Sequence, residues 1–562
     1  MLKTIFSYLG MAMFLVSCKS EKTVTDLIIH HAKIYAVDSS FATYEAMCIR
    51  DGKIVALGTN HEILKTYEAG HITDAKGKFI YPGFIDGHCH FLGYGLGLQE
   101  ADLTGTKSFQ EVLDKVVAFS GREKQFPEEV SKSTPEAARE TRWIMGRGWD
   151  QNDWDHKVYP TKEKLDSLFP ATPVFLMRID GHAALVNTKA LQLAQVNEDT
   201  RVEGGELLKD KNKLSGILID NAVDLVKRAI PATGKGKTDA ALLNAQERCF
   251  AAGLTTVDDA GVMHNDVKAM DALQKEGKLK IRIYAMLMDS APNYAYYLEK
   301  GPYKTERLNV RSFKFYADGA LGSRGACLFK DYSDKPHWRG FLLSPMQHFK
   351  KYAAVMDGKG FQMNTHCIGD SALNMVMDIY IRYCNEKKDH RWRIEHAQVV
   401  TPDDFKNFSG DIIPSVQPTH ATSDMYWVQE RLGAARVKYA YAYKDLLDAA
   451  GTITLGTDFP VEDISPLKTF YAAVVRKDAK GYPPNGFQVE NALSRQQALR
   501  GMTTWAAYAN FEEHEKGSLE AGKFADFVIL DTDLMNCKED VILKTRVLNT
   551  YVNGEEVYAA FR

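Results

Sequence analysis

The chain has 562 residues, of which 45% are hydrophobic and 25% charged, a composition typical of a globular protein with a large core. The formal net charge of −3 gives no support for nucleic-acid binding, or for binding an acidic membrane surface through charge. The 8 cysteines are scattered without a C-x-x-C pair, so we expect no disulfide framework in a chain of this size.

The first residues have the pattern of a targeting segment. Lys3 supplies a positive charge, and the mostly apolar run over 5–16 is too short to span a membrane. The run ends in Ser17-Cys18, which resembles a bacterial lipobox, in which the cysteine is lipidated and becomes the mature N-terminus. We therefore expect residues 1–18 to be a lipoprotein signal peptide, with the mature protein anchored to a membrane of the bacterial cell envelope on its extracytoplasmic side. An ordinary secretory signal that contains a cysteine is the alternative.

Short β-branched runs separated by turns occur at both ends of the chain. They cover 26–37, 46–50, 53–57, 527–530, 547–552 and 556–558. Asp51-Gly52 is a typical hairpin turn between two of them. Because both ends have this pattern of short strand-like runs, we predict that residues 24–82 and 515–562 form one small composite β-sandwich.

Between the two ends, strand-like runs alternate with segments of helical periodicity. The strand-like runs cover 141–148, 174–178, 253–257, 280–286, 312–316, 362–365, 393–394, 412–416 and 452–455. Repeated βα units predict an α/β fold, with residues 83–514 forming a parallel (β/α)8 barrel. We expect two insertions in it: a charged excursion around 120–140 and a β-ribbon around 203–220 over the barrel mouth. No glycine loop typical of nucleotide binding stands out, so we expect no organic cofactor.

Residues suited to metal binding follow several of these runs. The stretch 81–92, YPGFIDGHCHFL, ends a strand-like run with His88 and His90. Residues i and i+2 of a strand project to one face, and imidazole binds first-row metal ions well. An isolated H-x-H is more often a pair of surface histidines. Here four further candidates follow in chain order, each at the end of a strand-like run, where a barrel places its chemistry: Lys314, His366, His396 and Asp458.

The order of these residues and the phrases around them resemble the amidohydrolase superfamily, in particular the branch that includes N-substituted formamide deformylases. The phrases are PGFIDGHCH, FYADGALGSRGA, THCIGD, RIEHA, LGTDFPV and the closing GSLEAGKFADFVILD. The resemblance covers nearly all of the chain after the signal segment. It implies a TIM-type barrel of a metal-dependent hydrolase that acts on carbon–nitrogen bonds other than peptide bonds.

The resemblance also implies a site with two divalent metal ions, most often zinc. One ion would be held by His88, His90 and Asp458, and the second by His366 and His396. A hydroxide that bridges the two ions would attack the substrate carbonyl. Asp458 would take its proton and later pass a proton to the leaving nitrogen, which makes Asp458 the expected catalytic acid–base residue.

By the same resemblance, Lys314 would be carbamylated and would bridge the two ions. A lysine ammonium cannot bind a cation, but burial lowers a lysine pKa, and the neutral amine can add carbon dioxide to become an anionic ligand with two oxygens. The alternative is an uncarbamylated Lys314 in an ion pair with Asp318 or Asp458, beside a single metal ion.

Five further residues are candidate substrate contacts, each with a structural alternative. In GRGWDQNDWD, Trp149 could stack on a substrate and Asp150 could bind it through hydrogen bonds, or the stretch could be a surface turn. His182 could polarise a carbonyl or cap a helix. Arg324 could bind a carboxylate or a carbonyl, or form an ordinary surface ion pair. His420, which follows another strand-like run, is a weaker candidate of the same type as His182.

Together these patterns predict hydrolysis of a small amide-like substrate, with an N-substituted formamide or another N-acyl compound as the first expectation. A cyclic amidohydrolase or a deaminase is the alternative, because superfamily members share these ligands across many substrates. A lipid-anchored binding protein without catalysis is a rival of another class, which the complete ligand set and Asp458 disfavour. We expect no nucleic-acid partner and membrane contact only through the lipid; the sequence leaves a homodimer open.

Overall fold

The computed structural model describes residues 22–125, 142–231, 233–384 and 388–561. The predicted signal segment with Cys18 lies outside these ranges, as does most of the predicted excursion around 120–140. Within the ranges, none of the helices combines the length and the apolar character that crossing a bilayer requires.

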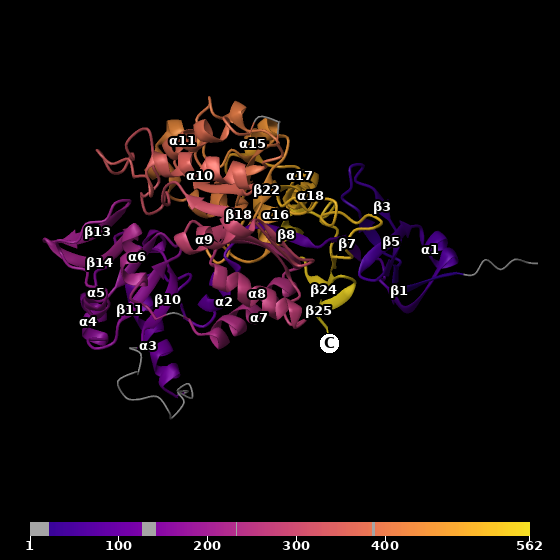
Figure 1. The fold of residues 1–562 in the computed structure, drawn as a ribbon, viewed down its shortest axis with the longest axis horizontal. Coiled ribbons are helices and arrows are strands. Elements are labelled where there is room, and N and C mark those ends of the chain that lie inside the picture. Colours follow the sequence, from indigo (N-terminus) through magenta and orange to yellow (C-terminus); the bar gives the residue numbers. More distant parts are fainter. Residues whose placement is uncertain (1–21, 126–141, 232, 385–387, 562) are drawn as a thin grey trace, which may run out of the picture.

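Eight parallel strands of the described residues form a nearly closed barrel at the centre of the molecule (Figure 1). In sheet order they are β8 (Phe84–Cys89), β15 (Leu254–Val262), β16 (Arg282–Met288), β18 (Leu308–Tyr316), β19 (Gln362–Cys367), β20 (Trp392–His396), β21 (Ile412–Val416) and β22 (Thr454–Leu455). The short β22 lies against β8 and brings the ring almost to closure. The predicted TIM-type barrel is therefore confirmed.

Helices cover the outside of the barrel, which explains why its strands are buried on both faces. The main ones are α7 (Lys235–Ala251), α8 (His264–Lys275), α9 (Ala291–Lys300), α10 (Met346–Lys359), α11 (Asp370–Tyr380), α15 (Tyr443–Ala450), α16 (Pro466–Val475), α17 (Arg495–Gly501) and α18 (Thr504–Ala509). Shorter helices lie at the barrel mouth or in connections: α2 (Phe91–Gly97), α12 (Pro418–Asp424), α13 (Val428–Leu432), α14 (Ala434–Val437) and α19 (Glu539–Ile542). The short β17 (Tyr303–Lys304) pairs with β18.

A second sheet is inserted between β8 and β15. Its order is β13 (Gly205–Asp210), β14 (Lys213–Asp220), β12 (Ala183–Val186), β11 (Val174–Arg178), β10 (Ile144–Trp149) and β9 (Ala101–Asp102). It carries α3 (Phe109–Gln125), α4 (Glu163–Leu168), α5 (Thr188–Leu193) and α6 (Asn221–Lys227). The runs predicted at 141–148 and 174–178 correspond to β10 and β11, but assigning them to the barrel was wrong. The ribbon expected at 203–220 is the β13–β14 hairpin, at the edge of this inserted sheet.

Two smaller sheets lie at the opposite end of the molecule from the inserted sheet (Figure 1). One has the order β5 (Lys53–Gly58), β4 (Ala46–Arg50), β1 (Thr23–His30) and β6 (Tyr67–Asp74), and α1 (Asn60–Thr66) joins two of its strands. The other has the order β25 (Glu555–Ala559), β24 (Val547–Val552), β23 (Phe527–Leu530), β7 (Phe79–Pro82), β2 (Lys33–Tyr35) and β3 (Thr43–Tyr44). β7 and β23 pair antiparallel, and residues of both sheets share one hydrophobic cluster. That residues 24–82 and 515–562 fold as one domain stays a prediction.

Glycines let the chain close tightly where the barrel ends meet. A Cβ at Gly456 would lie 2.5 Å from the backbone nitrogen of His88, and a Cβ at Gly87 would lie 2.2 Å from Thr454 Oγ1. Because both positions are glycine, the loop after β22 can lie directly against the end of β8. The backbone N–H of Asp458 then donates to the carbonyl of His88 at 2.8 Å. This contact fixes the first and last of the predicted ligands side by side.

Candidate metal centre

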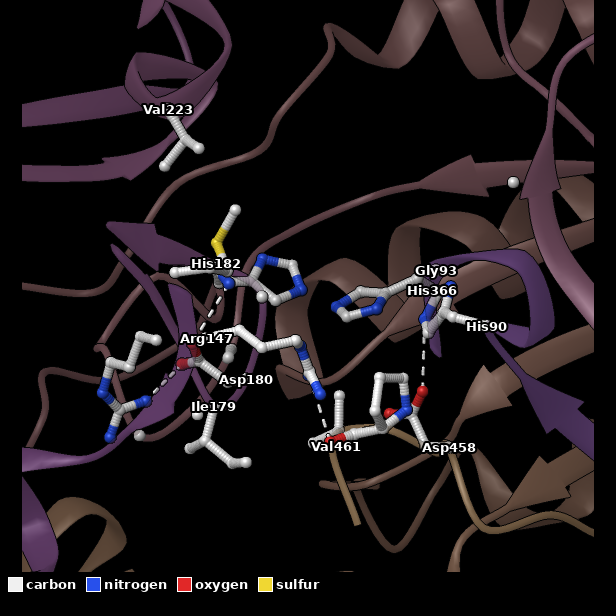
Figure 2. A pocket seen from close by; sticks show the side chains of 18 of the residues that line it. His90, Gly93, Arg147, Ile179, Asp180, His182, Val223, His366, Asp458 and Val461 are labelled. Atoms are coloured by element: carbon white, nitrogen blue, oxygen red, sulfur yellow. Dashed lines mark hydrogen bonds and ion pairs between the residues drawn. The ribbon is translucent and has the colours of Figure 1, made fainter. Parts of the chain in front are cut away.

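Three of the predicted ligands form a compact group at the barrel mouth. His88, His90 and Asp458 each offer one ligand atom, and the three atoms lie within 4.8 Å of one another. Asp458 Oδ1 lies 3.2 Å from His90 Nε2 and 3.7 Å from His88 Nε2. Figure 2 shows His90 and Asp458 turned toward each other. The His90 Nδ1–H donates to the Ala260 carbonyl at 2.9 Å, which leaves Nε2 for a cation.

The remaining histidines lie beside this group. The His396 ring lies 4.5 Å from the His366 ring and 4.9 Å from the His88 ring, centroid to centroid. His396 also forms a second potential ligand group with His420 and Asp458, again within 4.8 Å. The sequence predicted His420 as a substrate contact, whereas the structure places it with the ligands. All six predicted ligands therefore gather at one mouth, with His420 as an addition.

Buried nitrogen atoms without hydrogen-bond partners show that the site fits a cation. His366 Nε2 and His396 Nδ1 are both buried and accept or donate no hydrogen bond within the described residues. Burial, followed by the positive charges of neighbouring side chains, holds the pKa of both imidazoles well below the usual range. Neutral imidazoles are the form that binds metal. Two histidine clusters that share one aspartate are a donor set suited to divalent ions such as zinc.

Lys314 is buried within this group. Its Nζ lies 3.1 Å from His88 Nε2. Burial lowers the pKa of Lys314 to about 8, against the raising effect of Glu395 and Asp458. In the described part of the chain Lys314 forms no ion pair within 4 Å, so the ion pair with Asp318 or Asp458 considered above is not seen. The amine is therefore placed where its neutral form is easily reached.

Glu395, which the sequence analysis did not single out, supports the His88–His90–Asp458 group through its contact with His88. Glu395 is fully buried, and its Oε2 accepts a hydrogen bond from His88 Nδ1. Glu395 Oε1 also pairs with Arg393 Nε at 2.7 Å. Burial alone would raise the pKa of Glu395, but Arg393 and His88 together hold it well below its usual range. The charged carboxylate fixes the His88 ring with Nε2 toward the site. The sequence signal that could have identified Glu395 is a charged residue within the strand-like run RIEHA.

A cavity of about 1440 Å³ opens above the metal centre, between the barrel mouth and the inserted sheet. The barrel contributes the ligands, and the inserted sheet contributes the facing wall, which includes Arg147, Asp150, Asp180, His182 and Asp220. Figure 2 shows both walls, with His182 and Arg147 on one side and His90 and Asp458 on the other. The insertion is therefore a part of the site. The sequence predicted a ribbon over the barrel mouth and candidate contacts at Asp150 and His182, but not that they belong to a separate sheet.

The candidate substrate contacts differ in whether they line the cavity. Trp149 is 1% exposed and lies in the core of the inserted sheet, with its Nε1–H donating to the Leu176 carbonyl, so stacking on a substrate was wrong. Arg324 lies outside the cavity lining and pairs with Asp334 at 2.8 Å, which is the alternative considered for it. Asp150 does line the cavity, but it is already paired with a buried arginine.

His182 remains as the candidate nearest the metal centre. Its ring lies 5.0 Å from the His366 ring, and its Nδ1 lies 2.7 Å from Asp220 Oδ1. Burial would lower the pKa of His182, but the hydrogen bond and charge of Asp220 raise it above its usual value. The residue that caps α5 is Asn187, so His182 is not a helix cap. His182 therefore presents its Nε2 edge to the cavity, held in place by a buried carboxylate.

Comparisons with known proteins agree with this geometry. Residues 71–558 match the amidohydrolase family (Amidohydro_3). The putative amidohydrolase YtcJ of Bacillus subtilis is 30% identical over 543 residues, which cover 94% of this chain and 99% of that protein. The N-substituted formamide deformylase of Arthrobacter pascens is 24% identical over 550 residues, with 94% and 97% covered.

A solved structure is similar over most of its length. It is that of an uncharacterized metal-dependent hydrolase of Pyrococcus horikoshii OT3, which superposes with a TM-score of 0.72 and 29% identity and covers 91% of this chain and 99% of the other. The family match spans the barrel with its histidine and aspartate ligands and the inserted sheet. The chain thus belongs to the amidohydrolase family and is a metal-dependent hydrolase acting on carbon–nitrogen bonds.

Proposed function

We propose that the protein hydrolyses the amide-like bond of a small N-acyl compound, with N-substituted formamides as the first candidates. The observation that carries this proposal is the His88–His90–Asp458 group at the floor of a cavity large enough for a small molecule. The choice of substrate is supported by the 24% identity to a formamide deformylase, which extends over nearly both chains. A cyclic amidohydrolase or a deaminase is the second candidate, because members of the superfamily with different substrates share these metal ligands.

The geometry gives each side chain a task. Divalent ions held by the histidines would, when bound, supply a water molecule that is nucleophilic near neutral pH and would polarise the substrate carbonyl. Asp458 Oδ1 faces His88 and His90, while Oδ2 lies 3.6 Å from His420 Nε2. Oδ2 is therefore the atom that accepts a proton from the water and returns one to the leaving nitrogen. His182, fixed by Asp220, contacts the acyl group from the opposite wall.

A substrate panel tests the proposal. Purified protein is loaded with zinc and assayed with N-formyl, N-acyl, lactam and aminopurine compounds, and released acid, free amine and ammonia are measured separately. The expected result is acid and amine from the first two classes, abolished by a chelator and restored by divalent ions. Release of ammonia from aminopurines would favour the deaminase instead. Ring opening of lactams alone would favour the cyclic amidohydrolase.

We further propose that Lys314 is carbamylated and bridges two ions. The Lys314→Ala variant is expected to lose activity by at least about 100-fold, because the bridging ligand is lost, and short carboxylic acids should restore part of it. Metal analysis of the wild type should find about two divalent ions per chain.

Two measurements separate this proposal from a single-ion site. Intact-mass spectrometry under non-acidic conditions should detect the mass of added carbon dioxide in the wild type and not in Lys314→Ala. One tightly bound ion per chain, together with an unchanged rate in Lys314→Ala, would contradict the bridging role. The proposed substrate class would survive that result, since His88, His90 and Asp458 form a group without the lysine.

We also propose that the protein works outside the cytoplasm as a lipoprotein, on the basis of Ser17-Cys18 after an apolar run. The Cys18→Ser variant should move from the membrane fraction to the soluble fraction. A protein that stays in the soluble fraction in the wild type as well would contradict the anchor.

A further inference from the structure

We propose that Arg147 binds a carboxylate of the substrate, so that the preferred substrates are N-acyl compounds that carry an acid group close to the scissile bond. This inference rests on the proposed function. Arg147 belongs to β10 of the inserted sheet, and its side chain lines the cavity. Figure 2 shows it extending from that sheet toward the loop that carries Asp458.

Arg147 is half-buried and forms no ion pair with a carboxylate of the described residues. One of its five N–H donors is used, by Nη2, which donates to the Pro460 carbonyl at 3.1 Å. In the described part of the chain no carboxylate lies within ion-pair distance, 4 Å, of Arg147. Burial of a charge without a partner is costly. The cavity therefore holds a cation whose remaining donors can be satisfied by a ligand.

Arg178 shows that an arginine of this cavity wall can be fully paired. Arg178 lines the same cavity, but it is paired with Asp150 and Asp180, and its Nε donates to Gln151 at 2.8 Å. Asp102 sits directly across from Arg147 on β9, yet its carboxylate accepts from the backbone N–H of Thr104 instead.

The other acids near Arg147 are Glu100 and the expected metal ligand Asp458, and neither forms an ion pair with it. Burial raises the pKa of Glu100 to about 7, against the lowering effect of Arg147, so this carboxyl is only partly charged at neutral pH. It lines the cavity without contacting the guanidinium within 4 Å. A substrate carboxylate would accept two parallel hydrogen bonds from the planar guanidinium, which is the strongest pairing this side chain makes.

A β-bulge after Arg147 explains why its side chain enters the cavity. Gly148 has φ +102°, and the register of β10 with β11 shifts between Arg147 and Trp149. This bulge breaks the usual alternation, so that Trp149 enters the core while Arg147 enters the cavity. On the other side, a Cβ at Gly97 would lie 2.7 Å from Arg147 Cδ, so the glycine leaves room for the arginine stem.

Arg147 lies close to the chain segments that carry metal ligands. Its hydrogen-bond acceptor, Pro460, lies two residues after Asp458, and the helix that makes room for it, α2, begins directly after His90. Arg147 thus lies between the chain segments that carry two of the metal ligands. An acid group bound there would orient the neighbouring acyl–nitrogen bond over the metal centre, which is a positioning effect.

The test compares matched substrates. Wild type, Arg147→Met and Arg147→Lys are assayed with N-formylphenylalanine and with its primary carboxamide, in which a neutral amide of similar shape replaces the carboxylate. Arg324→Met is the control, because Arg324 is an arginine outside the cavity. Thermal midpoints and metal content are measured for every variant, so that a folding defect is recognised.

Wild type should prefer the acid by about 10- to 100-fold in kcat/KM, mainly through KM, which is the usual effect of a charged hydrogen-bonding pair. Arg147→Met should lose this preference, because kcat/KM for the acid falls at least about tenfold more than kcat/KM for the carboxamide, and Arg147→Lys should retain part of the preference. Arg324→Met should behave as wild type. An equal loss on both substrates in Arg147→Met would show that Arg147 only ties the inserted sheet to the Asp458 loop.

A binding measurement keeps the inference separate from the proposed function. Phenylacetate and phenylacetamide are titrated into the zinc-loaded protein by calorimetry. Weaker phenylacetate binding in Arg147→Met than in Arg324→Met supports the carboxylate site even if no amide is hydrolysed. Equal phenylacetate affinity in the two variants, or a wild-type preference for the carboxamide substrate, would overturn the inference. Absence of hydrolysis with any amide, by contrast, would count against the proposed function alone.

Discussion

Replacing Asp458 with asparagine is expected to lower kcat by about 10³-fold or more, because the substitution removes the proton acceptor and the negative charge shared by both ligand groups. Asp458 is nearly buried, with Oδ1 facing His88 and His90. Burial alone would raise the pKa of Asp458, but its interactions with His90, His88 and His420 hold the pKa well below its usual range. The carboxylate is therefore charged at every pH at which the enzyme works, as a proton acceptor must be.

The measurement is single-turnover rate and metal content in the same preparation of the Asp458→Asn variant. Asparagine keeps the shape of the side chain, so retained metal with a lost rate assigns the effect to proton transfer. Loss of metal would instead assign it to ligation. Asp533→Asn is a matched control, since Asp533 also accepts several hydrogen bonds but lies at the small sheets. A rate for Asp458→Asn within about tenfold of wild type would contradict the proposed mechanism.

Much of this site could be predicted from the sequence because a parallel barrel brings the C-terminal ends of all its strands to one face, although they are far apart along the chain. Each predicted ligand stands at or just beyond the end of an apolar run, and all such ends meet at one mouth. His88, His366 and His396 could therefore be placed together without any knowledge of the loops. Lys314 could be placed likewise, because it lies near the end of β18.

The inserted sheet could not be separated from the barrel for the opposite reason. β10 and β11 pack apolar residues on both faces, in two different clusters, as strands covered on both faces commonly do. Periodicity therefore could not show to which sheet they belong. Trp149 was named for its residue type, and the sequence does not show the bulge at Gly148 that turns Trp149 into the core while Arg147 faces the cavity. Glu395 was missed because its importance lies in the partners His88 and Arg393, which are distant in the chain.

Replacing Glu395 with glutamine is expected to weaken metal binding by about 10- to 100-fold, because it removes the charged acceptor that orients His88. The same change should destabilise the fold by about 3 kcal/mol, since Arg393 loses one of its two buried carboxylate partners. Asp258, which pairs with Arg393 at 2.8 Å, keeps this loss from being larger. Metal affinity is measured by competition with a chelator, and stability by the thermal midpoint of the metal-free protein.

The pH dependence has a defined sign. Because the pKa of Glu395 is lower in the folded protein than in the unfolded chain, its contribution to stability is present above about pH 4.3 and is lost as the pH falls toward the folded-state value. The wild type should therefore lose stability on acidification more steeply than Glu395→Gln does. Equal slopes for the two proteins would show that Glu395 is not held charged by its partners.

A second buried pair provides the control that separates stability from metal binding. Asp526 pairs with the buried Arg282 at 2.5 Å, and it joins the barrel to the sheet of β23 and β24, away from the metal centre. Asp526→Asn should lower the thermal midpoint as Glu395→Gln does, because a buried arginine again loses its carboxylate. It should leave metal affinity unchanged, because no histidine ligand depends on it. Equal metal affinities in Glu395→Gln and Asp526→Asn would mean that Glu395 acts only on the fold, and that His88 needs no charged support to bind its ion.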